Sequence, residues 1–393
     1  MTTPKFRRIV PLLAMVVAQL ACAPVADAKP SPSPDKATQI IYVGTRAEGA
    51  TGGITAARFD PATGTLTRIG KAADVARPTW LLASPQRGLL YSVSEVGNDG
   101  KVEASVHGFR ADPVTGTLTQ ISQVKSGGGG ATHLAVGGTP PSLFVANYGT
   151  GHVAALPIQR DGTLLAPTSI MKNYGKGPDP KRQTGPHPHG VMTDRSGKYL
   201  FAVDLGADRI FLYKLDATRH ALSPAEIPFV SLPAGSAPRH MTMSNDGRFV
   251  YVLTEATSQL ITYRWDAGEG RLTPLTAVSI ERLDNRVPGS HAGEVTISRD
   301  GRFLYASNRG EDTVVTFALD ARTGKATEIQ RIDVGAKYPT ALVFDATQRW
   351  MFIASPGTNS VGVFARDPAT GKLAATGQSL TVPMAVTVAV IPR

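Results

Sequence analysis

The sequence predicts an all-β fold, a seven-bladed β-propeller whose blades are four-stranded antiparallel sheets, and two repeating features carry the prediction. An aromatic residue near the end of an apolar strand recurs about every 50 residues, a period that suits one blade per repeat. The seven copies are Tyr42, Tyr91, Phe144, Phe201, Tyr251, Tyr305 and Phe352. A hairpin turn resembling DPxTGxL follows each aromatic, and its Gly or small polar residue suits a tight turn. These turns span residues 60–66, 112–118, 161–164, 216–222, 266–272, 320–326 and 367–373.

An apolar strand, usually preceded by Pro or His, lies just upstream of each aromatic. The copies span residues 78–83, 131–136, 187–192, 238–243, 292–297, 339–344 and, at the C-terminus, 383–388. The last copy has no aromatic strand after it, and the first aromatic strand, 39–45, has no inner strand before it. We therefore expect the last strand to complete the first blade, which closes the ring and removes open sheet edges.

The stretch from Gly185 to Tyr213 shows one unit clearly. A His-bearing loop leads into a strand at 190–192, a polar turn at 194–197, a second strand at 199–203 and, after a Gly/Asp turn, a third strand at 209–214. The composition agrees, since 40 Gly, 29 Pro and only 18% charged residues are typical of all-β proteins rich in tight turns.

The N-terminus predicts export. Lys5, Arg7 and Arg8 precede an apolar run at 9–23, and Ala26-Asp27-Ala28 offers a cleavage site. We expect a signal peptide at 1–28, a Pro/Ser linker at 29–37 and the propeller at 38–393, in a periplasmic or secreted protein. Cys22 is the only cysteine, but Gln19 stands where lipoprotein signals usually carry Leu, so a lipid anchor is not expected. Cleavage after Ala28 leaves no thiol.

The net charge of +10 allows nucleic acid, an anionic surface or an acidic small molecule as a partner. Beyond the signal segment no run of Lys or Arg exceeds two residues, which argues against nucleic acid. The apolar run at 9–23 is too short to span a membrane. Because a propeller ring is complete in one chain, we expect a monomer.

The repeat also predicts which residues meet. Starts of inner strands and ends of second strands reach the same mouth of the central channel, where propeller ligands usually bind. Polar groups occupy nearly all of these positions: Thr132, His133, His187, His189, Arg239, His240, His291, Glu294 and Tyr338, and Arg46, Glu95, Asn147, Asp204, Glu255, Asn308 and Arg309. Imidazoles, guanidinium groups and carboxylates around one funnel suit an anionic substrate with acid/base chemistry. Asp194, Asp246, Asp300 and Asp345 fall at turns of the opposite mouth and are expected to shape it.

Several motifs carry a family resemblance. They are GPHPHG at 185–190, DLGADRI at 204–210, APRH at 237–240, the strand ending in Glu255, and GRFLYASNRG at 301–310. In this order and phase they resemble the lactonase family of seven-bladed propellers, which includes bacterial 6-phosphogluconolactonases and fungal carboxymuconate-lactonising enzymes. The resemblance covers essentially the whole chain after the signal segment.

The resemblance implies a catalytic set of His189, Arg239, Glu255 and Arg309. Glu255 or His189 would be the general acid/base, and the arginines would bind a substrate carboxylate or phosphate and stabilise oxyanion charge. From their places at the mouth we predict substrate-binding roles for His187, His240, Asp204, His291, Glu294 and Asn147. No cofactor and no metal is expected, although the two imidazoles of H-P-H could form half of a metal site.

The prediction is therefore a hydrolase of a small anionic sugar lactone, similar to 6-phosphogluconolactonase, which acts by direct attack of water because no nucleophile elbow is evident. Export departs from the cytosolic setting of a phosphorylated substrate and favours an unphosphorylated lactone. Two alternatives stay open: a non-catalytic periplasmic binding module, and a lactone-forming cycloisomerase that uses the same proton chemistry. The presence of all four catalytic candidates favours an enzyme.

Overall fold

The computed structural model describes residues 1–2, 38–84, 88–282, 284 and 287–392. The predicted signal peptide and the linker therefore lie outside the described residues, except for Met1 and Thr2. In the part of the chain that the structure describes, no helix has the length and hydrophobicity needed to cross a membrane.

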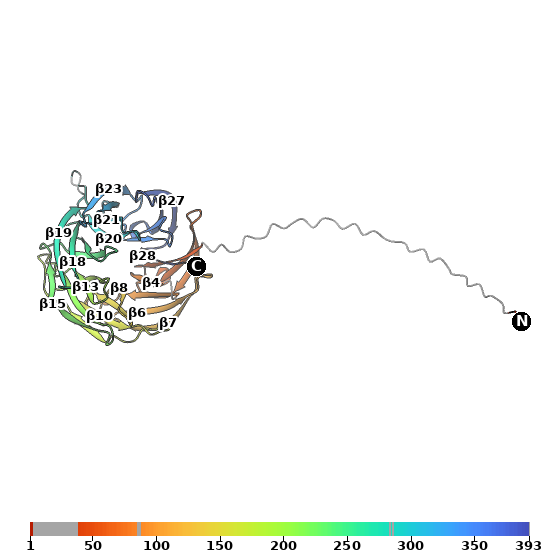
Figure 1. Cartoon of the computed structure of the whole chain (residues 1–393), viewed down its shortest axis with the longest axis horizontal. Helices are drawn as coiled ribbons and strands as arrows, with labels where there is room; N and C mark the ends of the chain where they lie inside the picture. The colour runs from red at the N-terminus through yellow and green to blue at the C-terminus, as the bar shows by residue number, and fades with distance from the viewer. Residues whose placement is uncertain (3–37, 85–87, 283, 285–286, 393) are drawn as a thin grey trace. The chain divides into compact units, whose positions relative to one another are not determined.

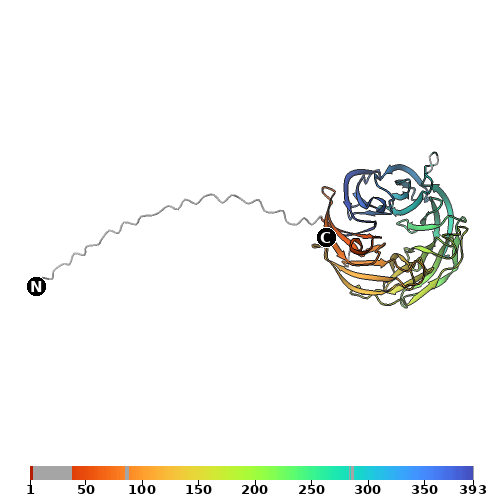
Figure 2. The same ribbon diagram turned by 180° about the vertical axis from the view of Figure 1, so that it is seen from behind.

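The described residues form seven four-stranded antiparallel sheets arranged in a ring, as Figures 1 and 2 show from opposite faces. Each sheet is one blade, and its strands follow one another from the channel outward. Blades 1 to 3 are β28 (Ala385–Pro392), β1 (Gln39–Thr45), β2 (Ile54–Asp60) and β3 (Thr65–Ala73); β4 (Leu81–Ser84), β5 (Leu89–Ser94), β6 (Ser105–Ala111) and β7 (Leu118–Lys125); and β8 (Ala131–Gly137), β9 (Ser142–Asn147), β10 (His152–Pro157) and β11 (Ser169–Lys172).

Blades 4 to 7 repeat the same order. They are β12 (Pro188–Thr193), β13 (Tyr199–Asp204), β14 (Arg209–Asp216) and β15 (Ala221–Ser231); β16 (Pro238–Met243), β17 (Phe249–Thr254), β18 (Gln259–Asp266) and β19 (Arg271–Ser279); β20 (His291–Ile297), β21 (Phe303–Arg309), β22 (Thr313–Leu319) and β23 (Ala326–Asp333); and β24 (Ala341–Phe344), β25 (Trp350–Ser355), β26 (Ser360–Arg366) and β27 (Leu373–Thr381). The loops include 3₁₀ turns at Gly49–Thr51 and Pro356–Thr358. The predicted seven-bladed fold is confirmed.

The repeated aromatics explain the period, because each lies on the second strand of its blade and is at most 1% exposed. They fill the interfaces between neighbouring blades. Phe352 of blade 7, for example, meets Phe59 of blade 1 edge to face, with ring centroids 4.7 Å apart. One large buried ring per repeat supplies apolar area that a thin sheet cannot bury alone.

The C-terminal strand closes the ring, as predicted. β28 pairs with β1 in antiparallel register, with Tyr42 opposite Ala389, and so provides the innermost strand of blade 1. It runs from Ala385 to Pro392 rather than over 383–388. A side-chain hydrogen bond of 3.0 Å from Gln39 Nε2 to Asp345 Oδ2 also ties blade 1 to blade 7.

The predicted turn aspartates cap the loops at the mouth away from Glu255. Asp345 Oδ1 accepts backbone hydrogen bonds from Arg349 and Trp350 at 3.0 and 2.9 Å. Asp194 Oδ1 does the same for Lys198 and Tyr199, at 3.1 and 3.0 Å. Their carboxylates are thus used to hold turns between first and second strands.

We predict that replacing Phe352 by Ala lowers the free energy of unfolding by about 3–5 kcal/mol, because it leaves a cavity at the ring-closing interface. Urea unfolding followed by tryptophan fluorescence measures this. Leu275, whose side chain is 44% exposed, is the matched control, and Leu275→Ala should change stability by less than about 0.5 kcal/mol. Equal losses in the two variants would contradict this account of closure.

Candidate active site

A buried carboxylate and three guanidinium groups form the electrostatic centre of one channel mouth. Glu255 follows β17 and is 3% exposed. Its Oε2 lies 3.2 Å from Arg239 Nε and 2.7 Å from Arg309 Nη2, and its Oε1 pairs with Arg182. Burial alone would raise its pKa, but the charges of Arg309, Arg239 and Arg182 outweigh burial and hold the pKa of Glu255 well below its usual range. Glu255 is therefore a fixed carboxylate.

The backbone of blade 6 fixes the same arginines. Arg239 Nη1 donates to the carbonyl of Gly293 at 2.6 Å, and Arg309 donates from Nε and Nη2 to the carbonyl of Ala292 at 3.1 and 2.6 Å. Both side chains are at most 5% exposed. Because their hydrogen bonds already hold them, these guanidinium groups need little reorganisation when negative charge develops beside them.

His189, on β12, lies next to this group. With Arg46, Thr79, Trp80, Arg239 and His240 it lines a small cavity at the mouth. Burial, followed by the charge of Arg239, lowers the pKa of His189 well below its ordinary value, so the ring is a neutral imidazole near pH 7. A neutral imidazole can accept a proton, and the nearby Glu255 carboxylate favours the imidazolium that would form.

Besides Arg239, whose Nε is ion-paired with Glu255, four residues lining the small cavity carry buried polar atoms without a hydrogen-bond partner in the described chain. The atoms are Arg46 Nε, Thr79 Oγ1, Trp80 Nε1 and His189 Nδ1. Buried polar groups are nearly always hydrogen-bonded, and each exception calls for an explanation such as a catalytic role or a bound water or ion. Their convergence makes the cavity a candidate place for a polar ligand or water.

His240 and Glu294 lie deeper in the channel and are hydrogen-bonded to each other. Nδ1 of His240 is 2.8 Å from Oε1 of Glu294, which also accepts from the backbone of Val295 at 2.9 Å. Burial raises the pKa of Glu294 to about 7 and, with Arg239, lowers the pKa of His240 well below its usual range. We therefore treat the contact as a hydrogen bond between neutral groups more than as an ion pair.

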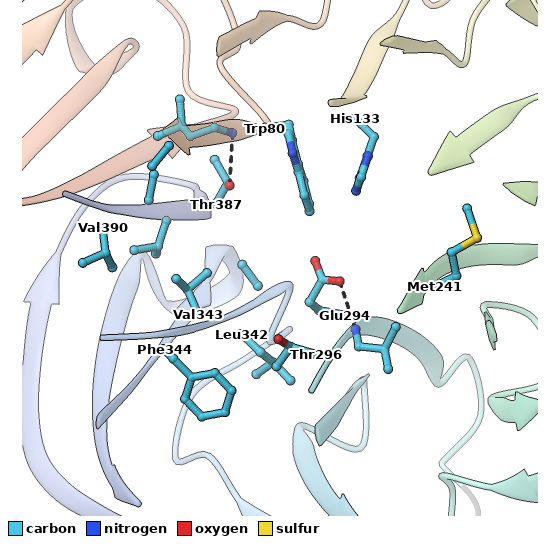
Figure 3. A pocket seen from close by; sticks show the side chains of 16 residues that line it. Trp80, His133, Met241, Glu294, Thr296, Leu342, Val343, Phe344, Thr387 and Val390 are labelled. Carbon is cyan, nitrogen blue, oxygen red and sulfur yellow. Dashed lines mark hydrogen bonds between the residues drawn. The ribbon is translucent and has the colours of Figure 1, made fainter. Parts of the chain in front are cut away.

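Packed rings divide the channel. The centroid of Trp80 lies 4.0 Å from that of His133 and 5.2 Å from that of His240, and His240 lies 5.1 Å from His189. Beyond these rings is a chamber of about 380 Å³ lined by both polar and apolar side chains. Figure 3 shows the Glu294 carboxyl pointing into this chamber toward Trp80 and His133, with Leu342 and Val343 among its walls.

The remaining predicted site residues divide into two groups. His187 lies at the rim, stacked on Tyr148 with centroids 4.5 Å apart, and its Nδ1 is 2.7 Å from the Tyr148 carbonyl. His291 begins β20 at the same mouth, with a buried Nδ1 that lacks a partner among the described residues. Of the two histidines of H-P-H, His189 lines the cavity and His187 anchors its loop.

The substrate-binding roles predicted for Asp204 and Asn147 do not fit their surroundings. Both residues are 0% exposed. Asp204 accepts from the backbone of His187 at 2.7 Å and from Asn173 at 2.7 Å, and Asn147 is bonded to Ser126 through both ends of its amide. Their polar atoms are used to position the loops at the mouth, which the repeat alone could not reveal.

Arg182 is a site residue that the sequence analysis missed. It belongs to the 173–187 connection between β11 and β12, which reaches over the mouth, and its Nη2 lies 3.4 Å from the Tyr148 hydroxyl. Gln183 pins this connection by donating to the Leu205 carbonyl and to Asp208, both at 2.8 Å. Among the described residues no three His, Cys, Asp or Glu side chains gather as metal ligands.

Comparison with known proteins agrees with this architecture. A family model described as "Lactonase, 7-bladed beta-propeller" matches residues 40–390. The chain belongs to the lactonase family. The lactonase-family resemblance of the sequence motifs is thereby confirmed.

Relatives align with this lactonase-family chain over most of its length. The 6-phosphogluconolactonase of Bacillus subtilis (strain 168) is 29% identical over 89% of this chain and 97% of its own. The 6-phosphogluconolactonase of Formosa agariphila is 27% identical over 87% and 96% of the two chains. The solved structure of the periplasmic gluconolactonase of Pseudomonas aeruginosa is 34% identical in sequence and superposes with a TM-score of 0.84, covering 90% of this chain and 99% of that one.

We predict that E294Q makes the protein more stable relative to wild type as pH rises. The fold raises the pKa of Glu294 to about 7, so it favours the protonated acid, and this contribution is present below the unfolded pKa of about 4.3 and lost as pH rises to 7. Gln cannot ionise, so the variant should gain on the order of 2–3 kcal/mol over wild type between pH 5 and 8. Urea unfolding at pH 5, 6, 7 and 8 measures the difference.

The buried histidines change stability in the opposite direction with pH, but they are common to both proteins and cancel in the difference. Glu226→Gln is the control, because the Glu226 side chain is 86% exposed and its ion pair is with Lys214 at the surface. Its difference from wild type should be nearly independent of pH. A constant difference for E294Q as well would contradict the shifted pKa.

Proposed function

We propose that the protein hydrolyses a small anionic sugar lactone by acid/base-assisted attack of water. The observation that carries the proposal is the convergence of His189, Arg239 and Arg309 around the fixed carboxylate of Glu255 at one channel mouth. The printed activities of the Bacillus and Pseudomonas relatives support lactone opening as the reaction. These activities favour lactone hydrolysis over a non-catalytic binding module and over a lactone-forming cycloisomerase.

His189 is the general base in this mechanism. The sequence left the role open between Glu255 and His189, and the surroundings of the two residues favour the histidine. Glu255 is held ionised by three arginines, so it can neither donate a proton nor accept one readily. His189 is neutral and has a buried Nδ1 without a partner among the described residues.

Water activated by His189 attacks the lactone carbonyl carbon, and the proton moves from water to the imidazole. Negative charge then develops on the carbonyl oxygen, where Arg239 and Arg309 stabilise it. As the ring C–O bond breaks, the imidazolium returns its proton to the departing oxygen, and the product is an open-chain hydroxy acid. Glu255 holds the arginines and stabilises the transient imidazolium.

We also propose that the protein is exported and acts as a monomer. The N-terminal segment has the charge, length and cleavage pattern of a signal peptide. The periplasmic location in the name of the Pseudomonas relative supports this setting. A lactone available outside the cytosol would then be the substrate.

The deciding assay follows hydrolysis of glucono-1,5-lactone, with and without a 6-phosphate, after subtraction of spontaneous opening. We predict that H189Q lowers kcat by about 10²- to 10⁴-fold because it removes the base. E255Q should also lower kcat strongly, since the arginines lose the group that holds them. Loss of activity in both variants is the expected result.

His220→Asn is the matched control. His220 lies in the turn between β14 and β15, away from the mouth, with a left-handed φ of 51° that Asn tolerates. It should keep wild-type kcat and KM. Wild-type turnover in H189Q would exclude the histidine as base, and wild-type rates no faster than spontaneous opening across the panel would exclude lactone hydrolysis.

A further inference from the structure

A surface basin of about 480 Å³ adjoins the candidate active site. Arg46, which follows β1, lines both this basin and the small cavity that holds His189. Asp312 after β21, and Lys337 and Tyr338 before β24, form further walls. Three blades thus meet at a hollow that shares Arg46 with the small cavity of the proposed reaction centre.

Arg46 is a cation of this mouth whose charge no described residue compensates. Arg182, Arg239 and Arg309 share the carboxylate of Glu255, and Lys337 Nζ pairs with Asp312 Oδ2 at 2.9 Å. The guanidinium of Arg46 makes no hydrogen bond or ion pair with any described residue, although its Nε is buried. A buried, charged donor without a partner is costly, so an anion that binds there gains the full charge-assisted interaction.

The surroundings of Arg46 are rigid. Its backbone N–H donates to the carbonyl of Met384 at 3.0 Å, which ties it to the ring-closing segment. Tyr338 adopts a left-handed φ of 68° and is held by a 2.7 Å hydrogen bond from its N–H to Asp312 Oδ1. The guanidinium carbon of Arg309 lies 5.0 Å from the centroid of the Tyr338 ring. The basin wall therefore connects directly to a proposed catalytic arginine.

We propose that Arg46, assisted by Lys337, binds the anionic group of the substrate, a phosphate or carboxylate carried at the end away from the reacting carbonyl. The proposal rests on the proposed lactone hydrolysis. In this scheme Arg239 and Arg309, whose charges face Glu255, stabilise oxyanion charge. Arg46 makes the enzyme select charged lactones over neutral ones.

The test compares three lactones: neutral glucono-1,5-lactone, its 6-phosphate, and an aldarolactone that carries a carboxylate at that end. In R46Q we expect KM for the preferred charged lactone to rise about 10- to 100-fold, the size of one charge-assisted hydrogen bond, with kcat within about twofold of wild type. The KM and kcat for the neutral lactone should be the same in R46Q as in wild type. K337Q should have a smaller effect, about two- to fivefold, because Lys337 is largely exposed.

The charged lactone with the lower wild-type KM identifies the anion as phosphate or carboxylate. Arg282→Gln is the matched control, because Arg282 is also a cation but is paired with Glu311 at 3.3 Å, and it should change none of the constants. The proposal would be overturned if R46Q had the wild-type KM for both charged lactones. It would also be overturned if KM rose equally for charged and neutral lactones.

A binding measurement separates this proposal from the proposed function. Calorimetric titration with 6-phosphogluconate and with inorganic phosphate requires no turnover. If no lactone is hydrolysed but phosphate binds wild type and R282Q and not R46Q, the anion subsite stands and the hydrolase proposal falls. If neither charged lactones nor these anions distinguish R46Q from wild type, the subsite proposal falls, whatever the activity of the enzyme.

Discussion

Pairing of β28 with β1 is the constraint on which the ring depends, since every other blade is built from consecutive strands. The two ends of the propeller meet in blade 1, and Phe59, Phe352, Val388 and Val390 pack in one cluster across the joint. Because β28 is made last, the ring cannot close until synthesis is complete. Closure also holds the mouth together, for Arg46 is attached through its backbone to Met384, just before β28.

The second constraint is electrostatic. Burying the guanidinium groups of Arg239 and Arg309 at one mouth would be costly without the carboxylate of Glu255, and burying that carboxylate would be costly without them and the more exposed Arg182. The result is a preorganised, net positive site in which His189 stays neutral. Deeper in the channel burial raises the pKa of Glu294 to about 7, because that side chain is hydrogen-bonded to His240 and is not ion-paired with a guanidinium group. The pKa values of Glu255 and Glu294, two carboxyl groups in one channel, thus differ because their neighbouring side chains differ.

Much of the fold and of the candidate site could be predicted from the sequence, because the repeating aromatic, turn and inner strand fix both the order and the direction of the strands. The ring, its closure, and the meeting of His189, Arg239, Glu255 and Arg309 at one mouth all follow from that repeat. Arg182 could not be predicted, since it lies in the irregular 173–187 connection outside the repeat. Asp204 and Asn147 were expected to face a substrate because their strand ends reach the mouth. The hydrogen bonds that occupy them come from loops whose path only the structure shows.

The cluster of the Trp80, His133 and His240 rings has a kinetic consequence. These rings and Glu294 lie between the small cavity and the chamber beyond, so under the proposed function substrate enters and product leaves on the side of the arginines. If the substrate is an anionic lactone, as proposed, the opened product keeps the anionic group and gains a carboxylate, so it is more negative than the substrate. Product and substrate then compete for the same positive mouth, and accumulated product should inhibit turnover competitively.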